Sequence, residues 1–248
     1  MSTAYQIFKY AIFHPLVKFG FKARVEGLEN VPREGGVILA SNHIAAMDSI
    51  VVPAMVPRPM TFPAKAELFS GNNLGTKIVA WFLKTIKMVP MDRSGGRASA
   101  DALQAISDVL AEGRVVGIYP EGTRSPDGRL YKGKTGMARI ALLNGVPILP
   151  VGVVGTQKAK GLFGIPWIRR PIVAIGEPLE FPQYHGQTNT KVLRYVTDEV
   201  MASIQRLTGQ TFVDVYATRV KSGDLRDGGS EAFIRSRPGD GVAPQPRA

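Results

Sequence analysis

The chain has 248 residues, which is enough for one large domain with a substantial buried core. Its 31 basic and 20 acidic residues give a net charge of +11, which favours an anionic partner such as nucleic acid, an anionic membrane or a phosphorylated substrate. The absence of cysteine excludes disulfides, thiolate zinc sites and cysteine nucleophiles.

Residues 1–20 form a segment of their own, rich in bulky apolar side chains, with interspersed lysines and no acids. Pro15 is expected to interrupt any single helix here. Aromatic residues and lysines without acids are typical of a segment in a membrane interface, although a helix that caps the core would show the same pattern. No apolar run reaches the roughly 18 residues of a membrane-spanning helix, and no signal-peptide pattern is found.

Residues 21–210 alternate apolar runs of strand length with amphipathic helices. This pattern predicts the α/β class: a single domain with a mixed, largely parallel central sheet flanked by helices. The extension 211–248 becomes rich in charge, Gly and Pro, and we expect it to be disordered from about residue 222. The expected strands are 21–25, 37–40, 115–119, 146–154 and 172–175, and the expected helices are 74–85, 98–112, 135–143 and 191–207.

A histidine follows the apolar run 37–40, and an aspartate comes five residues after it, as His43 and Asp48. A histidine at the end of a buried strand, with a carboxylate at the start of the next element, suits a general base and the group that orients it. The alternative is a histidine whose ring is simply bonded to the backbone of a tight turn.

The loop with Arg93 and the loop with Glu121 also follow apolar runs, and both carry groups that suit an anion. Arginine guanidinium binds phosphate in a planar, bidentate way, and N–H groups and a hydroxyl at a glycine turn form an anion cradle. Glu121 is expected to bind a substrate hydroxyl, or else to fix Arg124 or the turn. Because sites in such sheets form where strands end, we expect a base beside a phosphate pocket. The candidate ligands are Lys65, Arg93, Glu121, Gly122, Thr123 and Arg124.

Four motifs occur in order along the chain: Asn42-His43 with Asp48, then residues 89–93, 119–125 and 146–151. In sequence and spacing they resemble the motifs of the glycerolipid acyltransferases, the family of 1-acyl-sn-glycerol-3-phosphate acyltransferase. The resemblance covers roughly residues 20 to 210. The chain departs from the family pattern at Tyr119, where the family usually has Phe, and at Lys87, where it usually has Gly.

The resemblance implies an O-acyltransferase of phospholipid biosynthesis that needs no cofactor and no metal. A fatty acyl group would move from acyl-CoA or acyl-carrier protein to the sn-2 hydroxyl of 1-acyl-glycerol 3-phosphate (lysophosphatidic acid), giving phosphatidic acid. His43 would act as the base and Asp48 would orient it, while the candidate ligands above would bind the acceptor. The expected partners are the membrane surface and its anionic phospholipids, at the cytoplasmic face of the cell membrane, with peripheral or monotopic attachment and no nucleic acid.

Several alternatives remain. Relatives with the same motifs acylate glycerol 3-phosphate, other lysophospholipids or glycolipids. Residues 128–135 match the phosphate-loop pattern G-x-x-x-x-G-K-T, but such a loop should start directly after a strand, and here a loop containing Pro126 precedes it. A nucleic-acid-binding module would need a recognition helix, a zinc pattern or an aromatic RNA-binding signature, and none is present. A basic lipid-binding protein without catalysis is the last alternative.

Overall fold

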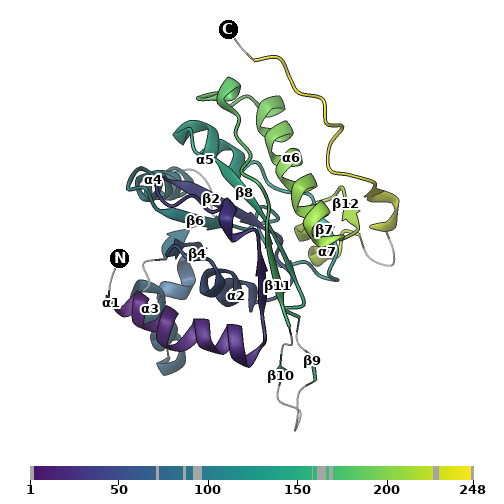
Figure 1. Cartoon of the computed structure of the whole chain (residues 1–248). Helices are drawn as coiled ribbons and strands as arrows, with labels where there is room; N and C mark the ends of the chain where they lie inside the picture. The colour runs from purple at the N-terminus through teal and green to yellow at the C-terminus, as the bar shows by residue number, and fades with distance from the viewer. Residues whose placement is uncertain are drawn as a thin grey trace.

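The structure, a computed structural model, describes residues 3–70, 73–85, 88–91, 97–157, 159–160, 166–167, 170–225 and 229–246. A six-stranded sheet with the order β1-β11-β8-β2-β6-β3 forms its centre (Figure 1). Strands β11 and β8 pair antiparallel and the other neighbours pair parallel, which confirms the predicted mixed, largely parallel α/β sheet. The strands are β1 (Arg24–Glu26), β2 (Val37–Ser41), β3 (Met60–Thr61), β6 (Val115–Ile118), β8 (Ile148–Val154) and β11 (Ile172–Ile175).

Helices cover both faces of this sheet. Successive side chains of a strand point to opposite faces, so Ile38 of β2 enters one core and its neighbour Leu39 enters the other. The first core lies under α4 (Arg97–Ala111), α5 (Gly136–Asn144) and α6 (Thr190–Thr208). The second lies under α2 (Asp48–Met55) and the N-terminal helix, and Figure 1 shows these two elements away from α5 and α6.

The N-terminal segment is one continuous helix made of α1 (Thr3–Ile7), η1 (Phe8–Phe13) and η2 (Leu16–Gly20). The prediction that Pro15 breaks it is wrong, because Pro15 keeps helical dihedral angles of φ −61° and ψ −42°. Wide π-type turns on both sides accommodate a residue that has no N–H to donate. Buried Val17 packs into the core, and Lys9 Nζ donates to the backbone oxygens of Val56 and Arg58 beyond the end of α2.

The helix α3 (Leu74–Thr85) has the bounds that its apolar periodicity predicted. None of the helices in the described part of the chain is both long and apolar enough to span a bilayer. Several short elements were not predicted from the sequence. They are β4 (Pro63–Lys65), β5 (Val89–Met91), β7 (Leu130–Tyr131), β9 (Ala159–Lys160), β10 (Pro166–Trp167), β12 (Phe212–Val213), β13 (Ile234–Arg235), α7 (Ala217–Ser222), and the short helical turns η3 (Leu28–Asn30), η4 (Ala66–Phe69), η6 (Pro182–Tyr184) and η7 (Glu231–Phe233).

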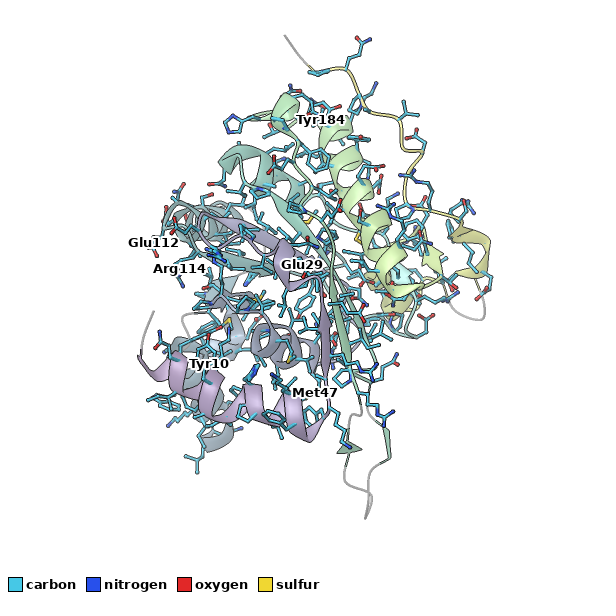
Figure 2. All side chains as sticks on the ribbon, viewed as in Figure 1. Tyr10, Glu29, Met47, Glu112, Arg114 and Tyr184 are labelled. Carbon is cyan, nitrogen blue, oxygen red and sulfur yellow. The ribbon has the colours of Figure 1, made fainter. Side chains whose placement is uncertain are left out.

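The C-terminal extension packs against the body of the protein. Strand β12 lies between β7 and β13 in a three-stranded sheet, beside one end of α6 (Figure 1). Farther on, Arg237 pairs with Glu199 at 2.5 Å, and Tyr184, labelled in Figure 2, donates from its hydroxyl to the backbone oxygen of Pro244 at 2.6 Å. The structure thus gives specific contacts to part of the stretch for which the sequence predicts disorder from about residue 222.

Candidate active site

The strand order brings two of the sequence motifs together. Because β2 and β6 are adjacent and parallel, their carboxyl ends lie at the same edge of the sheet. His43 follows β2, and the turn that begins at Tyr119 follows β6. The two loops are bonded directly: the His43 amide donates to Glu121 Oε1 at 3.1 Å, and the Ser125 amide donates to the His43 carbonyl at 2.6 Å.

His43 and Asp48 form the hydrogen-bonded pair that the sequence predicted. The distance from His43 Nδ1 to Asp48 Oδ2 is 2.8 Å, and Asp48 is fully buried at the start of α2. An ionised carboxylate only accepts hydrogen bonds, so Nδ1 carries the hydrogen and Nε2 keeps a free lone pair. Among the described residues Nε2 has no hydrogen-bond partner, and 15% of the His43 side chain is exposed. The ring is therefore bonded to a carboxylate rather than to the backbone, and it presents a base to the surface.

Asp48 is held by three further donors. The amides of Ile44 and Ala45 donate to Oδ2 at 2.7 and 2.8 Å, and Thr156 donates from Oγ1 to Oδ1. Thr156 follows β8, the other parallel neighbour of β2, so three strand ends contribute to the site. Donors of this kind stabilise the charged form of a buried carboxylate and fix its orientation.

The ring of Tyr119 covers one face of the His43 imidazole. Their centroids are 3.9 Å apart and their planes are inclined by 13°, which is a stacked arrangement. The Tyr119 hydroxyl lies 3.2 Å from Ser49 Oγ in α2. Phe62 also stacks on Tyr119, with centroids 5.7 Å apart, so the imidazole is part of a cluster of three aromatic rings. Burial raises the pKa of the Tyr119 phenol well above its usual range, so it stays neutral.

Glu121 is part of the turn rather than a ligand on its surface. It is 1% exposed, and its second oxygen accepts from the Tyr131 amide at 3.0 Å. Of the roles expected for Glu121, the structure supports fixing the backbone turn, because both oxygens are already bonded to amides. Burial raises the pKa of the Glu121 carboxyl to about 8, although the two backbone bonds oppose the shift.

The rest of the turn faces outward and is cationic. Gly122 has φ +72°, a left-handed conformation that favours glycine, and Arg124 is exposed. Lys134 lies over the turn, with side-chain carbons 3.1 Å from the position that a Cβ on Gly122 would take. The side chain of Lys65 and all of Arg93 lie outside the described residues. The structure thus brings His43, Asp48 and residues 121–124 together, and leaves the two other candidate ligands untested.

The phosphate-loop pattern at residues 128–135 does not form such a loop. Strand β7 lies within the pattern, whereas a phosphate loop is a continuous turn between a strand and a helix. The described residues also contain no group of three His, Asp or Glu side chains arranged to hold a metal ion.

The model of the acyltransferase family matches residues 22–154, which include the strand ends and loops described above. The chain belongs to this acyltransferase family. A crystal structure of the 1-acyl-sn-glycerophosphate acyltransferase PlsC from Thermotoga maritima is similar to this acyltransferase, with a TM-score of 0.60 and 27% identity. The match covers 84% of this chain and 83% of that one.

Several curated relatives of this chain are named 1-acyl-sn-glycerol-3-phosphate acyltransferase. A 1-acyl-sn-glycerol-3-phosphate acyltransferase of Bacillus subtilis is 30% identical over 185 residues, covering 74% of this chain and 87% of the relative. Another from Borreliella burgdorferi is 36% identical over 138 residues, covering 56% and 53%. A chloroplastic one from Arabidopsis thaliana is 32% identical over 139 residues, covering 56% and 37%. The chain therefore spans only about a third to a half of two of these three relatives.

Sequence reasoning missed several residues that build the acyltransferase site. Asn42 was seen only as part of a motif. Its buried side chain bonds to the Val153 amide at 2.7 Å and to the Val153 carbonyl at 2.9 Å, which ties the His43 loop to β8. The sequence around Thr156 contains no motif that predicts a role in the site; it shows only that Thr156 follows an expected strand. Tyr119 was seen only as a mild departure from the family pattern, although its ring supports the imidazole.

Proposed function

We propose that this acyltransferase moves a fatty acyl group to the sn-2 hydroxyl of 1-acyl-glycerol 3-phosphate and so makes phosphatidic acid. The observation that carries the proposal is the pair of His43 and Asp48, in which no described residue bonds to Nε2, directly beside an exposed cationic turn. A base next to an anion cradle suits an acceptor that has both a hydroxyl and a phosphate. The names of the curated relatives support the same acceptor.

In the proposed reaction, His43 Nε2 removes the proton from the acceptor hydroxyl as the oxygen attacks the thioester carbonyl of the donor. Asp48 stabilises the imidazolium that forms and holds the ring in place. The C–S bond then breaks, and the proton on His43 passes to the leaving thiolate. The acyl group moves directly from sulfur to oxygen, so no covalent acyl-enzyme is needed. The donor, acyl-CoA or acyl-carrier protein, is a co-substrate and no other cofactor takes part.

Holding the acceptor phosphate places the hydroxyl beside the base. Arg124, with the amide and hydroxyl of Thr123, is proposed to bind that phosphate, and Arg93 and Lys65 are proposed as further cations. Gly122 shapes the turn, because its own amide donates to the Tyr119 carbonyl at 2.9 Å. Glu121 contributes by fixing the turn through two backbone bonds. An arginine and the donor groups of such a turn bind phosphate through charge-assisted hydrogen bonds, which are about twice as strong as neutral ones.

We also propose that the protein sits on the cytoplasmic face of the cell membrane, as a peripheral or monotopic protein that contacts anionic phospholipids. The N-terminal helix exposes large apolar side chains, and Phe8 on it meets Trp81 of α3 edge to face at 6.1 Å. A small cavity of about 60 Å³ between this helix and α2 includes Ser49, which bonds to Tyr119. We propose that acyl chains approach His43 from this side of the molecule. The exposed apolar side chains are Ile7, Tyr10, Ile12, Leu16 and Phe19, and on α3 Leu74, Ile78 and Trp81.

The test is acyl transfer from radiolabelled acyl-CoA to 1-acyl-glycerol 3-phosphate, comparing wild type with His43→Ala. We expect the variant to lose about 10²- to 10⁴-fold in rate, the usual contribution of a general base. His185→Ala is the matched control, because His185 is an exposed histidine beside Gly145, and it should keep full activity.

Other outcomes would change the proposal in defined ways. Full activity in His43→Ala would remove His43 as the base. If wild type were inactive with acyl-CoA but active with acyl-carrier protein or with another acceptor, such as glycerol 3-phosphate, a different lysophospholipid or a glycolipid, the reaction class would stand and the substrate would change. Inactivity with every donor and acceptor would leave a lipid-binding protein without catalysis.

A further inference from the structure

A lysine from the C-terminal extension reaches the cationic turn. Lys221, in the helix α7, donates from Nζ to Thr123 Oγ1 at 3.0 Å. The extension lies outside the residues that the family model matches. Because Thr123 Oγ1 accepts this bond, its own hydrogen is left to donate to an anion. One hydrogen bond thus links a segment without any of the four motifs to the turn that carries the third motif.

The position of Lys221 is built by the fold. Strand β12 pairs parallel with β7, the strand that follows the turn in the chain. Just after β7, the amide of Lys132 donates to the carbonyls of Val213 and Val215 at 3.2 Å each. Val215 and Ala217 are buried at the start of the segment that leads into α7. The same strand β7 contains Tyr131, whose amide bonds to Glu121. The turn and α7 therefore share one strand as their support.

Three cations surround the turn without a matching anion. They are Arg124, Lys134 and Lys221, and in the described part of the chain none of them forms a salt bridge. Partial loss of solvent on the side that faces the turn and the charge of Arg124 lower the pKa of the otherwise exposed Lys221 ammonium, and the Glu121 carboxyl opposes that shift only in part. Like charges gathered at one turn repel one another, so an anion bound among them would relieve that repulsion.

We propose that Lys221 binds the acceptor phosphate and, with Arg124 and Lys134, gives the site its preference for a phosphate monoester. This rests on the proposed transfer to a phosphorylated acceptor. A phosphate monoester carries a charge of about −1.5 to −2 at neutral pH. A phosphodiester headgroup carries a single negative charge at its phosphorus, so it gains less from a third cation.

The test compares Lys221→Gln with Arg219→Gln. Arg219 is exposed on the same short helix, and two residues along an α-helix correspond to a rotation of about 200°, so the control removes an equal charge from the opposite side. We expect Lys221→Gln to raise the KM for 1-acyl-glycerol 3-phosphate about 10-fold, the usual scale for losing one hydrogen bond to a charged group. The kcat and the KM for acyl-CoA should change less than about 2-fold, and Lys221→Arg should restore most of the acceptor affinity.

The preference between two acceptors shows whether Lys221 binds the phosphate or only supports the fold. With lysophosphatidylcholine as the acceptor, Lys221→Gln should change the KM little, so the preference for the monoester should fall about 10-fold. Equal losses with both acceptors, together with a lower melting temperature, would mean that Lys221 only supports the fold and would overturn the proposal. So would a Lys221→Gln variant that behaves like Arg219→Gln.

The proposed function and this inference fail in different ways. If wild type transfers no acyl group to 1-acyl-glycerol 3-phosphate, the proposed function fails, and calorimetric titration with glycerol 3-phosphate still decides the role of Lys221. Tighter binding by wild type and Arg219→Gln than by Lys221→Gln would support a phosphate site. Equal binding by all three proteins would overturn it.

Discussion

Glu121 is the buried residue of the cationic turn, and its carboxyl stays protonated to a higher pH than an exposed glutamate does. Its folded-state pKa is about 8 because burial disfavours the charged form, whereas a glutamate in an unfolded chain has a pKa of about 4.3. Between these values the folded protein holds a proton that the unfolded chain has lost. The stabilisation from that proton is complete below the unfolded pKa and is lost as the pH rises through the folded pKa.

Replacing Glu121 with Gln should remove this pH dependence. Near pH 5 we expect the variant to be less stable by about 1 to 3 kcal/mol, because an amide NH₂ would face the N–H of either His43 or Tyr131. As the pH rises to about 9, wild type should lose stability and the variant should not, so the difference should shrink. Urea unfolding across this range measures it. A difference that stays constant with pH would show that Glu121 does not titrate with folding.

The residues of the site differ in how visible they are in the sequence. His43, Asp48 and the third motif lie in short, ordered patterns, and the chemistry of each side chain predicts its use. Thr156 and Lys221 carry no such pattern. Thr156 reaches Asp48 because β8 lies parallel to β2, and Lys221 reaches Thr123 because β12 pairs with β7; such long-range pairings cannot be read from local sequence.

At the scale of elements, segments with a clear apolar pattern were predicted well, and strands of two or three residues were not. The helix α3 and the strand β11 have the bounds that their apolar patterns predicted. Strands of two or three residues, such as β7 and β12, have too few residues to show a period, and their partner strands define them. The continuous helix across Pro15 was missed because propensity alone argues against it, while packing of Val17 and Phe21 into the core holds it.

The N-terminal helix makes a prediction about membrane binding at this scale. On this helix the side chains of Phe8 and Phe13 are half-buried. Those of Ile7, Ile12 and Phe19 are 57, 46 and 69% exposed. Changing these three exposed residues to Ser should weaken binding to anionic liposomes at least about tenfold, since each buried apolar side chain contributes up to about 1.5 to 3 kcal/mol. Flotation with phosphatidylglycerol vesicles measures the binding.

The matched control changes exposed apolar residues elsewhere, namely Leu28, Leu143 and Val242. This triple Ser variant should bind the vesicles as wild type does. If both triple variants lost binding equally, general surface hydrophobicity would explain it. If neither lost binding, the N-terminal helix would not be the membrane contact.

For the whole molecule, the site depends on both sides of the sheet and on the far end of the chain. Helix α2 begins with Asp48 on one side, and α6 and the C-terminal extension lie toward the other. The extension has two parts with different contacts. Residues 211–222 form β12 and α7, which contact the turn. Residues 237–246 run back along α6 to Tyr184 and contact other parts of the protein.

Two truncations separate these parts. A chain that ends at residue 236 loses the pairs of Arg237 with Glu199 and of Pro244 with Tyr184, which are partly exposed and contribute about 1 kcal/mol each. It should keep the KM for 1-acyl-glycerol 3-phosphate within about 2-fold of wild type. A chain that ends at residue 210 also loses buried Phe212 and Val213, and Lys221 with them, so it should unfold at a lower urea concentration and bind the acceptor more weakly. Steady-state kinetics and urea unfolding on both chains measure these effects, and equal acceptor binding in the two would show that the extension serves stability alone.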